Sequence, residues 1–220
     1  MHREGITSVT IEQVRAARKA GYVVKILALC ERLTDADGRE GVSARVYPAL
    51  VPEGHPLAAV HGPKNAVFVE AEAAGDLMFY GAGAGGVETA SAVLGDLVSA
   101  ARRHVIGGPG VAESTQSNLP VFPIGVVSTR YQITMRVTDA PGVLSTVAGV
   151  LARHSVSVET VEQTVAGAAP ASDAGTPGAT ATLVIGTHRA REHDLAATVV
   201  ALRAEPVVAA VTSVLRVEGA

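Results

Sequence analysis

DAPGVLSTVAGVLARHSVSVETVEQ, residues 139–163, is the stretch that decides the fold of the second half of the chain. Within it, Pro141 and Gly142 predict a tight turn from a strand into a helix. The apolar residues that follow recur at helical spacing, which predicts a helix over 143–153. Strand-like sequence then occupies 156–165. The stretch therefore predicts a turn whose backbone lies at the start of a helix, followed by a second strand.

The sequence on either side of this stretch completes a pattern. An alternating strand is predicted over 131–137, before the turn. A strand over 181–187, a helix from about 191 to 203 and a strand over 208–217 follow it. The order is βαββαβ, and its two crossover helices predict a four-stranded antiparallel sheet with both helices on one face, a ferredoxin-like module.

The first half of the chain has a different arrangement. Thr10 is a predicted helix N-cap with Gln13 as its capping-box partner, and the helix over 11–20 stops at Gly21. Strands are predicted over 22–30, 42–50, 66–71 and 76–80, and a helix over 89–104. Because the connections between these strands are short, antiparallel pairing is favoured. The fold class is therefore α+β, with a mixed or antiparallel sheet and helices in the first half.

Composition divides the chain into two predicted domains, 1–106 and 129–220. The segment 107–128 between them begins GGPGVAESTQSNLPVFPIG and is predicted to be a linker, because it is rich in Gly, Pro, Ser and Asn. A second segment of low complexity, 166–179, is predicted to be a disordered hairpin tip, because strand-like sequence resumes directly after it.

The overall composition excludes several classes of protein. Of 220 residues, 48% are hydrophobic, yet no run approaches the roughly 20 apolar residues that a membrane span needs. The N-terminus lacks the apolar core of a signal peptide, so the expected location is the cytoplasm. Charges are mixed, with 18 basic and 21 acidic residues, and aromatic residues make up only 3%, which argues against a nucleic-acid surface. The single cysteine, Cys30, cannot form an internal disulfide and is interpreted as a small strand residue.

The sequence GAGAGG at 81–86 raises the question of a dinucleotide site. Gly81, Gly83 and Gly86 match the pattern G-x-G-x-x-G after a predicted strand. A dinucleotide fold would also need a parallel βαβ unit and an acidic residue about 20 positions later, and neither is found. The simpler interpretation is a glycine-rich corner that lets a strand turn tightly into a helix. Its backbone N–H groups at a helix N-terminus still suit a phosphate or carboxylate.

Other candidate sites are weaker. His188 and His193 lie in an exposed, arginine-rich helix start, so they are interpreted as solvated polar residues, and no metal site is predicted. Glu70 and Glu72 share one face of a predicted strand. They form either a metal or acid/base pair or, as we favour, part of a polar sheet face or a dimer contact.

Four segments of the first half together resemble the substrate-side half of homoserine dehydrogenase. They are HREGI at 2–6, GYVVKILAL at 21–29, HPLAAVHGPKNAVFVEAE at 55–72 and GDLMFYGAGAGGVETASAVLGDLV at 75–98. The second half resembles an ACT domain, the amino-acid-binding regulatory module of bacterial members of that family. The signature there is the opening stretch, 139–163, with the strand-helix-strand that follows.

The resemblance implies an NAD(P)-dependent oxidoreductase that interconverts homoserine and aspartate semialdehyde in the biosynthesis of threonine, methionine and isoleucine. It implies a homo-oligomer, a dimer or larger, in which the sheet forms much of the subunit contact. In the family the glycine loop faces nicotinamide and substrate, which makes Gly81, Gly83, Gly85 and Gly86 the expected cofactor-binding residues. Glu4, with Gly5, is expected near the substrate.

The resemblance also implies what this sequence lacks. In the family, the nucleotide-binding domain and the catalytic lysine precede the segment that matches HREGI. The lysines here are Lys19, Lys25 and Lys64, and all are interpreted as surface residues, so no catalytic residue is assigned. We expect that the chain alone does not turn over substrate. Two hypotheses remain open: a portion of a homoserine dehydrogenase, or a stand-alone protein that senses an amino acid and dimerises.

An effector site is expected at the turn that opens this section. The resemblance, with threonine as the expected effector, points to Asp139, Pro141, Gly142, Val143 and Leu144. Free N–H groups at the helix start can receive the carboxylate of an amino acid, while Asp139 pairs with its ammonium group. The alternative is a turn with a purely structural role. Ser155 stands where glycine is common after this helix and is expected to strain that corner.

Overall fold

The computed structural model describes residues 1–107, 118–165 and 180–219. The chain forms two compact units, each described here by itself. The main unit contains Met1–Pro52 and Leu119–Ala220, and the hairpin-helix unit contains Glu53–Asn118. The predicted loop 166–179 and residues 108–117 of the predicted linker lie outside the described residues.

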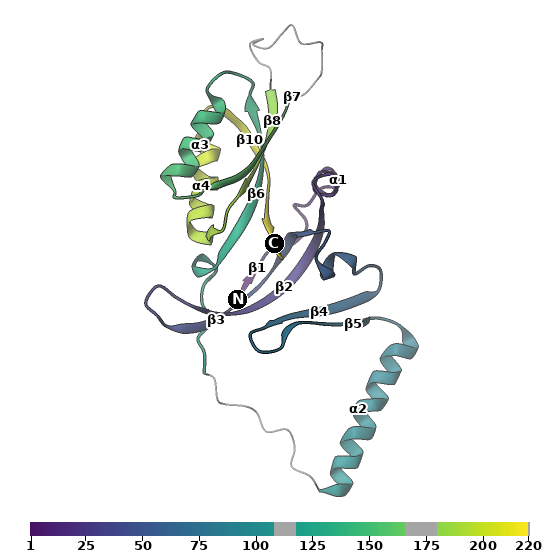
Figure 1. Cartoon of the computed structure of the whole chain (residues 1–220). Coiled ribbons are helices and arrows are strands. Elements are labelled where there is room, and N and C mark those ends of the chain that lie inside the picture. The colour runs from purple at the N-terminus through teal and green to yellow at the C-terminus, as the bar shows by residue number, and fades with distance from the viewer. Residues whose placement is uncertain (108–117, 166–179, 220) are drawn as a thin grey trace. The chain divides into compact units, whose positions relative to one another are not determined.

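The second half of the chain forms the predicted βαββαβ module within the main unit (Figure 1). Its elements are β6 (Ser128–Thr138), α3 (Val143–Arg153), β7 (Val158–Val165), β8 (Thr180–Thr187), α4 (Glu192–Ala204) and β10 (Val208–Val217). These strands are antiparallel in the order β10-β6-β8-β7. A short 3-10 helix, η2 (Ile124–Val126), precedes β6, and the two-residue strand β9 (Ala190–Arg191) pairs with its start. The predicted fold class is confirmed for this half.

The hydrophobic core of the module lies between its sheet and its two helices. Alternate residues of β6, such as Ile133 and Met135, are fully buried on one face. Leu151 of α3 and Leu195 of α4 pack in the same cluster, so both helices cover that face, as the ribbon also shows (Figure 1). Each such side chain contributes about 1.5–3 kcal/mol to the free energy of unfolding.

The first 52 residues also belong to the main unit. They form β1 (His2–Arg3), α1 (Ile11–Lys19), β2 (Tyr22–Thr34) and β3 (Glu40–Pro52). The capping box at Thr10 and Gln13 is present as predicted, and Gly21 takes a positive φ of 79° after the helix. β2 and β3 pair antiparallel over their whole length, which extends each predicted strand by several residues.

The module sheet continues into the first half of the chain. β10 pairs parallel with β3 through Arg216–Ala49 and Val217–Leu50, and β1 also pairs parallel with β3. Among the described residues this gives one eight-stranded mixed sheet. The compact units thus divide the chain after residues 52 and 118, at different places from the predicted domain limits at 106 and 129. Pairing between strands so distant in sequence leaves no local signal in composition.

The hairpin-helix unit contains η1 (Pro56–Ala59), β4 (Lys64–Ala71), β5 (Gly75–Ala82) and α2 (Gly86–Ile106). β4 and β5 form an antiparallel two-stranded sheet, as their short connection predicts. α2 has no buried residue, and its apolar side chains at Val93, Leu94 and Leu97 are each more than half exposed. No described helix of the chain is long and apolar enough to cross a membrane.

Candidate functional site

The glycine loop leads from the antiparallel strand β5 directly into α2. The N–H of Gly83 donates a hydrogen bond to the carbonyl of Pro63 (3.0 Å), which holds the loop against the start of β4. Gly85 is the N-cap of α2 and Gly86 is its first residue. Since the strand before the loop pairs antiparallel with β4, the loop is a strand-to-helix corner, as the sequence predicted, and it is not the turn of a parallel βαβ unit.

Two of the four glycines lie so close to a neighbouring side chain that a Cβ there would force that side chain to move. A Cβ at Gly83 would lie 1.6 Å from Nδ2 of Asn65, and a Cβ at Gly85 would lie 2.1 Å from Oε2 of Glu88. Gly85 also has a φ of 143°, which side chains other than glycine rarely allow. A Cβ at Gly81 or Gly86 would meet nothing within 4 Å. Of these four glycines, residues 83 and 85 are therefore the ones where a side chain would meet a neighbour, and the pattern G-x-G-x-x-G does not single them out as a pair.

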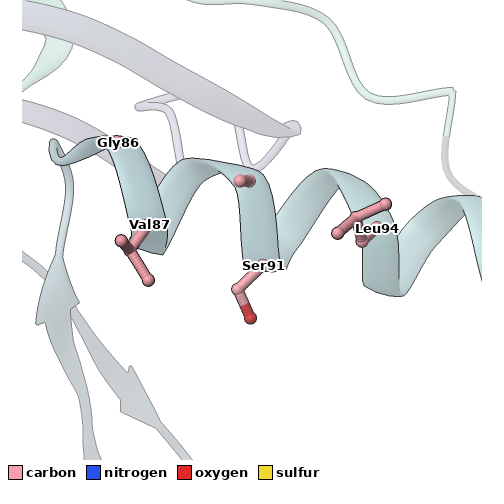
Figure 2. Close-up of a pocket in the computed structure, with 5 residues that line it drawn as sticks. Gly86, Val87, Ser91 and Leu94 are labelled. Carbon is pink, nitrogen blue, oxygen red and sulfur yellow. The ribbon is translucent and has the colours of Figure 1, made fainter.

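An open hollow runs along the first turns of α2 (Figure 2). Its lining residues are Gly86, Val87, Ala90, Ser91 and Leu94. No side chain caps the start of α2, so its first N–H groups can donate to a polar or anionic group of a ligand. Within the described residues, the loop does not belong to a whole dinucleotide-binding fold.

The expected effector turn adopts the predicted conformation. Gly142 has a φ of 88° and is the N-cap of α3, where no side chain caps the helix. Oδ1 of Asp139 accepts a hydrogen bond from Nε2 of Gln163 on β7 (3.5 Å), so the turn and this strand meet at Asp139. Val143 points into the core with 7% of its surface exposed, whereas Leu144 is 45% exposed. The structure thus leaves Asp139, the turn backbone and Leu144 accessible, while Val143 serves as a packing residue.

Ser155 confirms the expected strain at the end of α3. Among the described residues it is the one non-glycine with a positive φ, at 58°. The N–H groups of Ser155 and Val156 bond back to the carbonyls of Ala152 and Leu151. This is the Schellman arrangement, in which glycine is the usual residue at the position of Ser155.

Glu4, expected near the substrate, is held firmly in the main unit. Its N–H donates to the carbonyl of Val46 (2.8 Å), which extends the β1–β3 pairing. Its Oε1 lies 2.8 Å from Nε2 of His2, and its Oε2 accepts from Nη1 of Arg216 (2.8 Å). Partial burial opposes ionisation, but the hydrogen bonds from Arg216 and His2 outweigh it, so the pKa of Glu4 is lowered. Gly5, beside it, has no close neighbour that requires glycine.

The partner of Glu4, Arg216, lies at the centre of a buried polar network that the sequence did not reveal. Nε and Nη2 of Arg216 donate to the two carboxylate oxygens of Glu192, at 2.7 and 3.0 Å. Thr129 and the hydroxyl of Tyr131 donate to the same carboxylate, at 2.6 and 2.9 Å. Glu192 is 3% exposed and Arg216 is 8% exposed. The Glu192 carboxylate thus receives four hydrogen bonds, which offsets the cost of burying its charge.

A second branch of the network lies on β3. The guanidinium of Arg216 stacks over the ring of Tyr47, 4.4 Å from its centroid. The hydroxyl of Tyr47 donates to Glu218 (2.5 Å) and accepts from Nε of Arg45 (2.9 Å). Burial first, and then the charge of Glu218, raise the pKa of Tyr47 above its ordinary value. The network therefore joins β3 with β10 through side chains as well as through the backbone.

Two sequence features carry a weak signal for this network. Arg216 interrupts the apolar run Val214-Leu215-Arg216-Val217, and Glu192 begins a helix, where an acidic side chain is favourable. Both patterns are also common on solvated surfaces. Their pairing depends on a contact between β10 and the start of α4, which only the folded chain brings together.

The remaining sequence candidates lie apart from these sites. Lys19 and Lys64 are exposed, on α1 and β4, and Lys25 lies on β2. His188 and His193 are exposed as expected, as are Glu70 and Glu72. Cys30 lies on a strand as expected, with its side chain exposed. Among the described residues, no group of three or more His, Cys, Asp or Glu side chains is arranged to hold a metal ion.

Comparison with known families gives two matches that cover most of the chain. The homoserine dehydrogenase family matches residues 1–98, and the ACT domain matches residues 131–207. The homoserine dehydrogenase of Mycobacterium leprae is 53% identical over 100% of this chain and 48% of its own length. That of Corynebacterium glutamicum is 47% identical over 98% of this chain and 46% of its own length. The chain thus spans about half the length of these relatives.

Solved structures give the same result. A homoserine dehydrogenase from Thiobacillus denitrificans superimposes with a TM-score of 0.82 at 31% sequence identity, over 98% of this chain and 47% of that protein. A homoserine dehydrogenase from S. aureus shares the fold at 24% identity with a TM-score of 0.57, and 47% of it is covered. By sequence and by fold, the chain therefore belongs to the homoserine dehydrogenase family, as its C-terminal portion with an ACT domain.

Proposed function

We propose that this chain is the assembly and regulatory portion of a homoserine dehydrogenase, an NAD(P)-dependent enzyme that interconverts homoserine and aspartate semialdehyde in the cytoplasm. The observation that supports this most is the match to the M. leprae relative over the full chain, at 53% identity but over only 48% of the relative. In this proposal, the glycine loop contributes one wall to a cofactor site that another part of the enzyme completes.

We propose further that these 220 residues do not turn over substrate by themselves. The cofactor supplies or accepts hydride when it is bound. Within the described residues, the glycine corner fits only part of a dinucleotide. Lys64, which pairs opposite Ala82 of the loop, has an exposed side chain, and we assign it no role as a base. Without a complete cofactor site and a group to move the hydroxyl proton, nothing lowers the barrier to hydride transfer.

The test of this proposal is the oxidation of NADPH with aspartate semialdehyde by the purified chain. We expect no rate above the protein-free background. Robust turnover by the purified chain would refute the proposal of inactivity.

Mixing the chain with the portion of the Mycobacterium leprae relative that this chain does not cover tests the assembly role. We expect activity to appear on mixing, because α2 has an uncovered apolar surface at Leu94 and Leu97, 57% and 62% exposed, that suits a protein partner. Leu94→Glu should abolish the recovery. Val200→Glu, at a position 67% exposed on α4, is the matched control and should not. Equal recovery with both variants would argue against α2 as the docking surface.

The ACT module is proposed to bind an amino acid, with threonine as the first candidate. The uncapped start of α3 at Gly142 can receive a carboxylate, and Asp139 can pair with an ammonium group. Calorimetric titration with threonine should give heat at millimolar concentrations, and Asp139→Asn should weaken binding about tenfold or more. Absence of heat at such concentrations would count against threonine as the effector.

The second candidate function is a stand-alone amino-acid sensor that dimerises. The same uncapped turn supports it, because the proposed effector site lies within the ACT module and needs no cofactor. The mixing experiment separates the two functions. Threonine binding without any recovered activity would favour the sensor, whereas recovered activity that threonine inhibits would favour the enzyme portion. In either case we propose a homo-oligomer, which sedimentation analysis would detect.

A further inference from the structure

Arg216 lies where the ACT module meets the first half of the chain. It is on β10, opposite Tyr131 of β6 on one side and Ala49 of β3 on the other. Its side chain is 9% exposed, and the rings of Tyr47 and Tyr131 lie 4.4 and 5.5 Å from its guanidinium carbon. The guanidinium is therefore confined between two strands that belong to different halves of the sequence.

On the module side, Arg216 is fixed by the start of α4. Glu192 is the first residue of this helix, and its N–H donates to the carbonyl of Val127 (2.8 Å). Its carboxylate takes a bidentate pair of hydrogen bonds from Arg216, in addition to those from Thr129 and Tyr131. A planar guanidinium held by two parallel hydrogen bonds has a defined orientation, so a shift of the α4 N-terminus would move it.

On the other side, the remaining amino group of Arg216 reaches Glu4. Nη1 donates to Oε2 of Glu4 at 2.8 Å. Glu4 is in the HREGI segment, and its N–H is bonded to Val46 of β3. No hydrogen bond of the described residues links Glu4 directly to Glu192, so a single guanidinium connects the two carboxylates.

We propose that Arg216 is a positioning residue that couples the ACT module to Glu4, so that a displacement of α4 within the module reaches the HREGI segment through the side chains of Glu192, Arg216 and Glu4. As a route of regulation, this inference rests on the proposed function. The coupling itself is a property of the chain and is open to test without any ligand.

The test perturbs the module and measures Glu4. Tyr131→Phe removes one hydrogen bond to Glu192 but keeps the ring beside Arg216. NMR then measures the side-chain carboxyl shift of Glu4 and the exchange rate of its amide. We expect Tyr131→Phe to speed this exchange about threefold and Arg216→Met to speed it about tenfold. The double variant should match Arg216→Met alone, because the route is already broken.

The matched control is Arg153→Met. It makes the same substitution and removes an ion pair with Glu205 in the same module (3.0 Å), but it has no contact with Glu4. Exchange of the Glu4 amide should stay unchanged in this variant. If Arg216→Met does not fold, Arg216→Lys replaces it, because one ammonium group cannot hold both carboxylates in the same geometry.

Two outcomes would overturn the coupling. In the first, Tyr131→Phe alone changes neither the carboxyl shift of Glu4 nor the exchange rate of its amide. In the second, Tyr131→Phe speeds this exchange by the same factor in Arg216→Met as in the natural chain, because the displacement would then reach Glu4 without Arg216.

A titration with L-threonine distinguishes this inference from the proposed function. If threonine binds and shifts the carboxyl signal of Glu4 in the natural chain but not in Arg216→Lys, the result supports both threonine sensing and the coupling through Arg216. Binding with no shift at Glu4 refutes the coupling and leaves the effector role intact. Absence of binding refutes threonine sensing, and the ligand-free variants still decide the coupling.

Discussion

At the residue scale, Gly83 shows how one neighbouring side chain can favour a glycine. Gly83→Ala should destabilise the β4–β5 hairpin by about 1–3 kcal/mol, because the new Cβ would overlap Nδ2 of Asn65. Hydrogen exchange of the hairpin amides measures the loss as faster exchange. Asn65→Ala should restore protection in the double variant. Gly81→Ala, where a Cβ meets nothing within 4 Å, is the control and should have little effect.

Ser155 gives the opposite prediction, that introducing a glycine stabilises the protein, because its backbone conformation is one that favours glycine. Ser155→Gly should stabilise the main unit by about 0.5–1 kcal/mol, as relief of the left-handed conformation exceeds the added entropy of the unfolded chain. Urea unfolding measures the change. Ser157→Gly, which relieves no positive φ, should be destabilising, and a similar gain from both variants would contradict the explanation.

At the scale of elements, the contact between Glu4, which follows β1, and Arg216 of β10 should depend on pH. The pKa of Glu4 is below its ordinary value of 4.5, so its ion pair stabilises the fold above that pH. The contribution is lost as the pH falls through the lowered pKa of the folded state. Glu4→Gln should therefore cost about 1 kcal/mol or less at neutral pH, because the side chain is 41% exposed and screened.

Urea unfolding of the natural chain and of Glu4→Gln between neutral pH and pH 3 measures this contribution. The difference in the free energy of unfolding between the natural chain and Glu4→Gln should shrink below pH 4.5. Glu205→Gln, which breaks an ion pair elsewhere in the module, reports the general effect of removing a carboxylate. A constant difference for Glu4→Gln at all pH values would show that its charge does not contribute.

At the scale of the whole molecule, the shared sheet should make the main unit unfold cooperatively. Leu50 of β3 is fully buried and packs with Ala17 of α1 and Leu215 of β10. Leu50→Ala should therefore cost about 2–5 kcal/mol and lower the unfolding transition of the ACT module together with that of the first 52 residues. Calorimetry with hydrogen exchange on β8 measures this. An unchanged unfolding transition of the ACT module would mean that the two halves of the chain unfold independently. Val67→Ala, at a residue that is 61% exposed, is the control.

Several elements could be predicted from the sequence because their signals are local. The helix over 143–153 and the strand over 208–217 have the bounds that periodicity and the Pro-Gly turn indicated. The capping box at Thr10 and the strained corner at Ser155 follow from residues within one or two turns of each other. The antiparallel pairing of β4 with β5 follows from their short connection, and it excluded a dinucleotide turn at the glycine loop.

By itself, the sequence determined the βαββαβ order, the glycine corner and the family, because each depends on neighbouring residues or on an ordered set of motifs. Only the tertiary structure decided that β10 lies beside β3 and that Arg216 pairs with both Glu192 and Glu4. Glu4 and Arg216 are 212 positions apart. A contact over such a separation depends on how whole strands pair and on which charges become buried together, and neither leaves a pattern in the local sequence.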